Sequence, residues 1–133
     1  MDAEKFYGGR KVYLLDFLKD EKDTLVLKPS DGYGGRDVTI GRETTNEEWN
    51  RTIDKALKAD WVVQEYVNIP TMSMPHVVGG KLEFSLKKVN FNPFALNGKY
   101  SGSLSRLSDE SVINISHGGG LVPALTVEDE FQR

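Results

Sequence analysis

The sequence contains no cysteine, which excludes disulfide bonds, thiolate metal sites and a cysteine nucleophile. Its two histidines, His76 and His117, are too few and too far apart in the chain for a zinc site. No apolar run approaches the roughly 18 residues that a membrane-spanning helix needs, and the polar N-terminus, residues 1–10, does not resemble a secretory signal. We therefore expect a soluble, cytoplasmic protein with no membrane partner.

An excess of basic charge is also missing. The 17 Lys and Arg residues against 20 Asp and Glu residues give a net charge of −3. This balance argues against nucleic acid as a partner but leaves room for a local phosphate site. The 133 residues, of which 38% are hydrophobic, suit one globular domain.

The apolar pattern predicts many short strands and few helices. Thr45 and Glu48 form a capping-box pattern, and apolar residues from Trp49 to Leu57 then repeat at helical spacing, so a helix should end near residues 59–60. Residues 12–18 suggest a second short helix or a strand followed by one. Strands are expected at residues 25–27, 38–40, 61–67, 76–78, 81–84, 87–96, 100–107 and 112–116, with tight turns at residues 79–80 and 97–98. This order predicts an α+β fold with largely antiparallel sheets.

A glycine-rich turn follows the apolar strand at residues 25–27. Lys28 ends that strand, and Gly32, Gly34 and Gly35 lie between it and the next one. Glycines allow a backbone to approach phosphates closely, and a lysine supplies a compact positive charge for phosphate oxygens. The plainer interpretation is a glycine hairpin with a surface lysine. The spacing fits neither a Walker A loop nor a dinucleotide fingerprint.

The strand at residues 61–67 ends in Gln64, Glu65, Tyr66 and Val67. The alternating N–H and C=O groups of a strand end suit the edge of an adenine base. The alternative is a buried strand whose Gln64 and Glu65 side chains simply face solvent.

These two features, in this order, resemble the nucleotide-binding half of the ATP-grasp superfamily. The downstream strings resemble its remaining strands, particularly in the circularly permuted branch that includes glutathionylspermidine synthase-like proteins. The strings are Asn92-Pro93-Phe94, Tyr100-Ser101-Gly102, Leu104-Ser105-Arg106 and Asn114-Ile115-Ser116-His117-Gly118-Gly119. The resemblance covers residues 24–127. It implies one ATP-grasp-like domain over residues 1–133, as a fragment of a larger protein, with a nucleotide-binding subdomain at 24–70 and the remaining strands, with a phosphate and metal site, at 76–127.

The resemblance also implies roles for individual residues. Lys28 would contact the ATP phosphates and the N7 side of adenine, and the three glycines would form a lid over the phosphates. Gln64 and Glu65 would face the adenine amino group, and the backbone of Tyr66 and Val67 would complete the adenine edge. The catalytic Arg106 would meet the γ-phosphate or the developing acyl phosphate, and Asn114 would bind Mg²⁺.

The sequence departs from the family pattern at the metal site and at the ribose contact. The position two residues before Asn114 is normally acidic, and here it is Val112. The nearby acids Asp109, Glu110 and Glu83 are open alternatives. An acidic ribose contact is missing from residues 68–71, which read Asn-Ile-Pro-Thr.

The function that the resemblance implies is that of an ATP-dependent carboxylate–amine ligase acting through an acyl phosphate. Its cofactors would be ATP and Mg²⁺, and its substrates a small carboxylate and an amine. The main alternative is a non-catalytic ATP-grasp-like module that binds a partner or a peptide. A hydrolase that uses the glycine loop after His117 is a third reading, but no Gly-x-Ser-x-Gly motif accompanies that loop.

Overall fold

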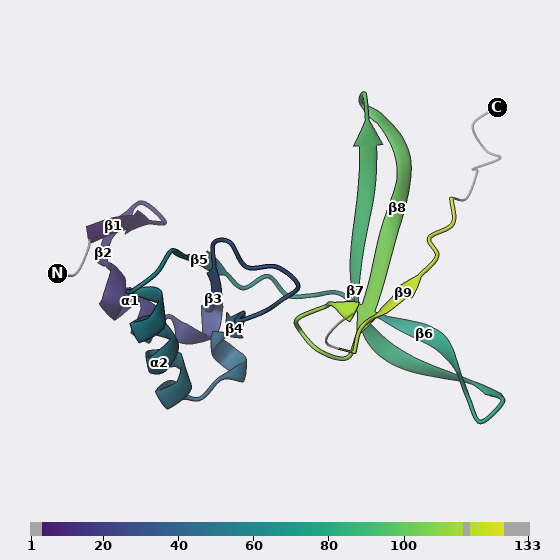
Figure 1. The fold of residues 1–133 in the computed structure, drawn as a ribbon, viewed down its shortest axis with the longest axis horizontal. Helices are drawn as coiled ribbons and strands as arrows, with labels where there is room; N and C mark the ends of the chain where they lie inside the picture. The colour runs from purple at the N-terminus through teal and green to yellow at the C-terminus, as the bar shows by residue number, and fades with distance from the viewer. Residues whose placement is uncertain (1–3, 116–117, 127–133) are drawn as a thin grey trace. The chain divides into compact units, whose positions relative to one another are not determined.

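The computed structural model describes residues 4–115 and 118–126, which divide into two compact units (Figure 1). Unit 1 extends to Asn68 and unit 2 begins at Ile69. The expected nucleotide-binding part, residues 24–70, falls almost wholly within unit 1, which also includes the residues before it. In the described part of the chain, no helix is long and apolar enough to cross a membrane.

Unit 1 consists of a hairpin, two helices and a small sheet. Its elements are β1 (Glu4–Tyr7), β2 (Arg10–Tyr13), α1 (Leu14–Asp20), the 3-10 turn η1 (Lys22–Thr24), β3 (Leu25–Pro29), β4 (Thr39–Ile40), the 3-10 turn η2 (Gly41–Glu43), α2 (Asn46–Ala56) and β5 (Trp61–Glu65). The sheet has the order β4-β3-β5, and both neighbours run antiparallel to the central β3. The predicted antiparallel strand after the glycine turn is therefore confirmed, as is a strand beginning at Trp61, although β5 ends at Glu65.

The predicted cap of α2 is also confirmed. The Thr45 side chain accepts a hydrogen bond from the Glu48 amide at 3.2 Å, which satisfies one of the unpaired N–H groups of the first turn. Trp49 and Ile53 are buried, as the apolar spacing indicated. The helix ends earlier than expected, because its last turn tightens: the Lys58 amide bonds to the carbonyl oxygen of Lys55 instead of continuing the α-helical ladder.

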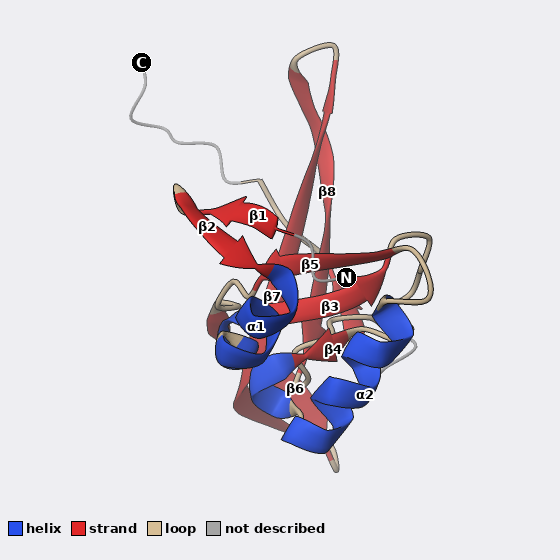
Figure 2. Cartoon of the chain, turned by 90° about the vertical axis from the view of Figure 1, so that its left-hand side faces the viewer, coloured by secondary structure: helices blue, strands red, loops and turns tan. Residues whose placement is uncertain are grey.

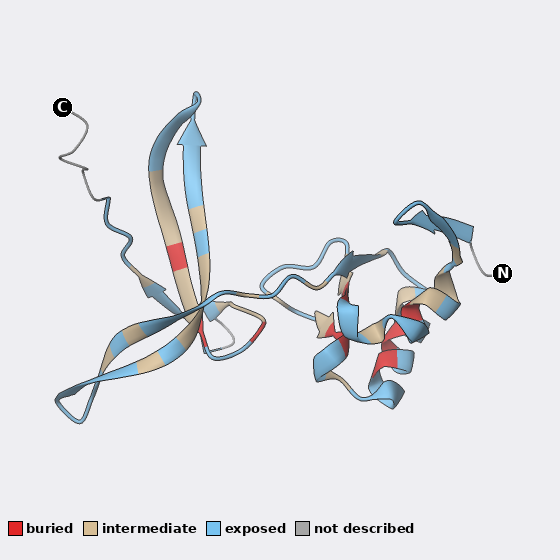
Figure 3. Ribbon diagram, turned by 180° about the vertical axis from the view of Figure 1, so that it is seen from behind, coloured by how far each residue is buried: buried red, intermediate tan, exposed pale blue. Residues whose placement is uncertain are grey.

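The core of unit 1 lies between the helices and one face of the sheet. It contains Leu18 of α1, Leu25 and Leu27 of β3, and Trp49 and Ile53 of α2. The indole N–H of Trp49 donates to the carbonyl oxygen of Leu18 at 2.7 Å, so the two helices are joined inside this core. Figure 2 shows the helices beside the sheet, and Figure 3 marks buried positions on the helices and on the sheet of this unit.

Unit 2 is an antiparallel sheet of order β6-β7-β8-β9. Its strands are β6 (Thr71–Val78), β7 (Lys81–Leu96), β8 (Lys99–Ser108) and β9 (Gly120–Val122). Both predicted tight turns are confirmed, and positive φ angles of 50° at Asn97 and 73° at Gly98 explain the choice of residues in the second. The strands expected at 81–84 and 87–96 are one continuous strand, with an irregularity between Pro93 and Ala95.

The strand predicted at residues 112–116 is wrong. Residues 112–115 form no strand, and Ser116 lies outside the described residues, as does His117. The backbone carbonyl of Asn114 accepts a hydrogen bond from the Gly119 amide at 3.0 Å, so it is bonded locally and not to a neighbouring strand. The strand that pairs with β8 is instead β9, after the glycines. The alternation at Val112–Ile115 resembled a strand, but this local bond takes the place of sheet pairing.

Most positions of the unit 2 sheet are exposed or half-buried (Figure 3), and many of the exposed residues are apolar. Leu82, Phe84 and Leu86 of β7 are each at least 64% exposed. Buried residues here include the polar Ser105, Ser108 and Ser111. The main apolar core of the described residues is therefore in unit 1.

Candidate functional site

Lys28 lies on the face of the unit 1 sheet opposite the helices. Successive strand residues point to opposite faces, and Leu25 and Leu27 face the helical core. Val26 and Lys28 therefore face away from it. Register pairs Lys28 with Val62 and Val26 with Gln64, so Gln64 shares the face of Lys28. Lys28 is half-buried and forms no ion pair among the described residues, which leaves its ammonium group available to an anion.

The glycine-rich turn is built by local hydrogen bonds and left-handed backbone. Gly34 and Gly35 have φ angles of 69° and 78°, which L side chains rarely adopt, and the Arg36 amide bonds back to the carbonyl oxygen of Tyr33 at 3.3 Å. The Arg36 guanidinium lies 5.4 Å from the centre of the Tyr33 ring. The Gly32 amide donates to the Pro29 carbonyl oxygen at 3.4 Å, so in this conformation it is not directed at a ligand.

The outer edge of β5 offers unpaired backbone groups at Glu65. Hydrogen-bonded and non-hydrogen-bonded pairs alternate along an antiparallel ladder. The Tyr66 amide bonds to Thr24 at 2.7 Å and the Ser30 amide to Asp60 at 3.0 Å, so the intervening pair of Leu25 and Glu65 is of the non-hydrogen-bonded kind. The N–H and C=O of Glu65 therefore point to the free edge, because β5 has only one neighbour in this sheet.

The side chains of Gln64 and Glu65 point in different directions. As neighbours in a strand they lie on opposite faces, so only Gln64 shares the face of Lys28. The Glu65 carboxylate instead accepts a hydrogen bond from the Tyr7 hydroxyl, which raises the pKa of that phenol above its usual value. Tyr7 ends β1 and its ring packs at 4.7 Å from that of Phe17.

Arg106 lies in the middle of β8, between β7 and β9. It faces Asn90 on one side and Leu121 on the other. Its Nε atom is buried and has no hydrogen-bond partner among residues 4–115 and 118–126. A buried N–H without a partner is costly, and a ligand oxygen is one way to satisfy it.

Lys88 of β7 shares the sheet face of Arg106, because it is paired with Ser108, two residues along β8. Its ammonium donates to the Ser111 hydroxyl at 2.6 Å. Asn90 and Asn92 continue the same face and are joined by a 2.6 Å hydrogen bond. This face therefore combines two cations with amide and hydroxyl groups, which is suited to an anionic ligand.

Asn114 is half-buried in the turn after β8, and its backbone carbonyl accepts from Gly119. Of the three acids left open as its companion, Asp109 is already paired with Lys87 at 2.6 Å. Glu83 lies opposite His76, on the sheet face that excludes Arg106. Glu110 is the acid that remains.

The residues present do not make a magnesium site on their own. Within residues 4–115 and 118–126, no three His, Asp or Glu side chains gather closely enough to hold a metal ion. Magnesium in proteins is held by one or two carboxylates together with waters and substrate phosphates. Asn114 and Glu110 would supply at most two of these oxygen ligands.

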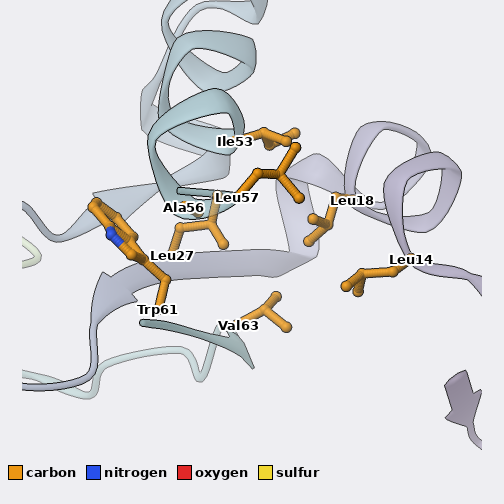
Figure 4. A pocket seen from close by; sticks show the side chains of 8 residues that line it. All are labelled: Leu14, Leu18, Leu27, Ile53, Ala56, Leu57, Trp61 and Val63. Atoms are coloured by element: carbon orange, nitrogen blue, oxygen red, sulfur yellow. The ribbon is translucent and has the colours of Figure 1, made fainter. Parts of the chain in front are cut away.

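The apolar groove of unit 1 lies on the helical face of its sheet, the face opposite Lys28 (Figure 4). It encloses ≈ 100 Å³ and is lined by Leu14, Leu18, Leu27, Ile53, Ala56, Leu57, Trp61 and Val63. Leu27 points into it from the helical side of β3, whereas Lys28 faces the other side. A purely apolar lining offers nothing to a triphosphate, so the groove is a loosely packed margin of the core.

Three residues near the predicted site were missed by the sequence reasoning. Tyr7 and Arg42 contact Glu65 and Tyr66, and Lys88 shares the face of Arg106. The first two come from elements remote in sequence from β5, so no local pattern indicated them. Lys88 could have been predicted from the sequence, because it is two and four residues from Asn90 and Asn92, which places all three on one face of a strand.

The comparisons with known proteins give one positive result. The family model described as ATP-grasp domain matches residues 12–126. The match begins in β2 and includes every predicted site residue. No curated protein sequence matches this chain.

Proposed function

Because the chain belongs to the ATP-grasp domain family, we propose that it binds ATP as the nucleotide-binding part of a carboxylate–amine ligase. Domains of this family bind ATP, usually with Mg²⁺, and serve ligase-type reactions. The strings at residues 92–119 further suggest the circularly permuted branch, which the family match leaves undecided.

The observation that carries the proposal is the free edge of β5 beside the face of Lys28. The Glu65 carbonyl can accept from the amino group of adenine. The bond of the Tyr66 amide to Thr24 carries the alternation one residue past the strand, so the Val67 N–H would point to the same edge and donate to N1. Tyr66 cannot take this role with its amide, which is bonded to Thr24. We therefore propose that the backbone groups of Glu65 and Val67 bind the adenine edge, in place of the Tyr66 and Val67 backbone expected from the sequence.

Lys28 would bind the phosphates. It is about three residues, or roughly 10 Å, from Glu65 along the sheet. The glycine turn that follows Lys28 would close over the phosphates, since its two left-handed glycines expose backbone without side chains. Gln64, on the face of Lys28, would be the side chain of the pair that reaches the nucleotide.

Arg106 would stabilise the transferred phosphoryl group. In the proposed reaction a carboxylate oxygen attacks the γ-phosphorus and ADP leaves. An amine then attacks the acyl carbon of the acyl phosphate and inorganic phosphate leaves. An arginine keeps its proton at working pH, so it can offset the developing negative charge without acting as an acid. Its unpartnered Nε is consistent with this role.

The test measures the binding of Mg-ATP to the full chain, either by titration calorimetry or from the rise in its unfolding temperature, which tryptophan fluorescence reports. A charge-assisted hydrogen bond contributes about 1.5–3 kcal/mol, so Lys28→Ala should weaken binding by roughly 10-fold or more. Lys58→Ala removes an exposed lysine beyond α2 and is the matched control. No binding at millimolar Mg-ATP, or equal affinities of the two variants, would contradict the proposal.

A second candidate is a non-catalytic module that keeps the nucleotide fold. It is favoured by Val112, which stands where the family pattern has an acid, and by the small metal-ligand set of the described residues. A measurement of ADP release by the full chain in the presence of Mg-ATP separates the two. ADP release that is abolished by Lys28→Ala supports the ligase, and nucleotide binding without ADP release supports the module.

A further inference from the structure

We propose that Arg42 is a positioning residue that holds the adenine-reading segment 65–67 in place. Arg42 belongs to the 3-10 turn η2 (Gly41–Glu43), which directly follows β4. The inference rests on the proposed function and adds to it a residue that determines base specificity.

The Arg42 guanidinium contacts the segment at two points. Its Cζ atom lies 4.1 Å from the centre of the Tyr66 ring, within the range of a cation–π contact. One of its terminal nitrogens donates to the side-chain oxygen of Asn68 at 3.3 Å. The two contacts flank Val67, the residue whose N–H is proposed to meet adenine N1.

Arg42 is itself fixed by the chain on its other side. Its Nε atom donates to the backbone oxygen of Asp23 at 2.9 Å. The backbone oxygen of the adjacent Thr24 accepts a hydrogen bond from the Tyr66 amide at 2.7 Å. Residues 23–24 therefore hold both the guanidinium and the segment beneath it, so that the three parts form one connected unit.

Gly41 allows this close approach. A Cβ atom at this position would lie 1.8 Å from the backbone oxygen of Lys22, so the two 3-10 turns can touch only because residue 41 has no side chain. This contact brings Arg42 next to Asp23. A lysine could keep the charge over Tyr66, but it lacks the planar group that stacks and donates in two directions at once.

No carboxylate competes for the Arg42 guanidinium, because it forms no ion pair in the described part of the chain. Its guanidinium is committed to Tyr66, Asn68 and a backbone carbonyl, all at the end of β5. Without Arg42, the segment keeps the bond of the Tyr66 amide to Thr24 and the contact of Glu65 with Tyr7, but loses the contacts that flank Val67.

The consequence is discrimination between purine bases. Adenine offers a donor at N6 and an acceptor at N1, whereas hypoxanthine offers an acceptor at O6 and a donor at N1. A carbonyl at Glu65 and an N–H at Val67 match adenine and oppose hypoxanthine. This selectivity depends on a fixed spacing of the two backbone groups, which is what Arg42 maintains.

The experiment compares the full chain with Arg42→Ala, Arg42→Lys and the control Arg51→Ala, an exposed arginine on α2. Affinities are measured for Mg-ATP, Mg-ITP and tripolyphosphate, and amide hydrogen exchange is followed over residues 64–69. For Arg42→Ala we expect the preference for ATP over ITP to fall at least about threefold. Exchange of the segment should rise about tenfold, whereas tripolyphosphate affinity should be unchanged. Arg42→Lys should lose most of the preference as well.

The outcomes are distinguishable. If the wild-type chain prefers ATP and Arg42→Ala keeps that preference, or if its tripolyphosphate affinity falls as far as its ATP affinity, the positioning role is overturned while ATP binding stands. If Arg42→Lys behaves as wild type, charge alone suffices and the geometric argument is wrong. If the wild-type chain binds no nucleotide, the proposed function fails and this inference fails with it.

Discussion

Replacing Trp49 by phenylalanine should destabilise unit 1 strongly, because two separate terms act at the same place. Trp49 is 1% exposed and its indole N–H donates to the Leu18 carbonyl at 2.7 Å. Phenylalanine leaves that buried acceptor without its partner, at a cost of about 1–3 kcal/mol. It also leaves roughly 40 Å³ of ring volume empty, at about 24 cal/mol per Å³, or ~1 kcal/mol. The expected loss is therefore about 2–4 kcal/mol.

Tryptophan fluorescence during urea and thermal unfolding measures this loss in unit 1 alone, because both tryptophans, Trp49 and Trp61, lie there. A shift of the midpoint by about 10 °C or more is expected for so small a unit. Trp61→Phe is the matched control: its ring is half-buried and its indole donates no hydrogen bond among the described residues. The reasoning is refuted if Trp49→Phe shifts the midpoint no further than Trp61→Phe.

Two further predictions concern Tyr7 and Gly41. Glu65→Gln should lower the pKa of Tyr7 toward its ordinary 10.0, seen in a phenolate absorbance titration referenced to Tyr7→Phe. The hydrogen bond to Glu65 raises the Tyr7 pKa in the folded state, so this bond stabilises the fold fully below pH 10.0 and progressively less as the pH rises further. The prediction is contradicted if Tyr7 titrates identically in the wild-type chain and in Glu65→Gln. Gly41→Ala should destabilise unit 1 by about 3 kcal/mol or more, because the added Cβ clashes with the backbone of Lys22. The control Gly120→Ala places its Cβ in open space and should change the stability little. Equal unfolding midpoints for the two variants would count against this prediction.

Local signals predicted the elements of this chain well where the physics is local. The Thr45 cap depends on residues three positions apart, and the turn at Asn97 and Gly98 depends on the φ angles that those residues tolerate. The strand expected at 112–116 failed for the opposite reason. Its residues have the composition of a strand, but whether a strand forms depends on a partner. β8 pairs instead with β9, which is only three residues long and begins with a glycine, so its sequence gives a weak strand signal.

The candidate site divides along the same line. Lys28 and the glycine turn could be proposed as a phosphate site from the sequence, because the strand, its final lysine and the glycines are contiguous. The roles within Gln64–Val67 could not, because they depend on which of two alternating ladder positions each residue occupies, and Thr24 and Asp60 set that alternation through their bonds to Tyr66 and Ser30. A shift of one position would exchange the two sets of backbone groups and turn Tyr66, instead of Glu65, toward the open edge. In our proposal Arg42 supports the same alternation, because it holds Tyr66 and Asn68 next to residues 23–24. The Glu65 and Val67 groups then face the open edge with the spacing that adenine needs. The effect of Arg42→Ala on base preference therefore tests this alternation as well as the role of the residue.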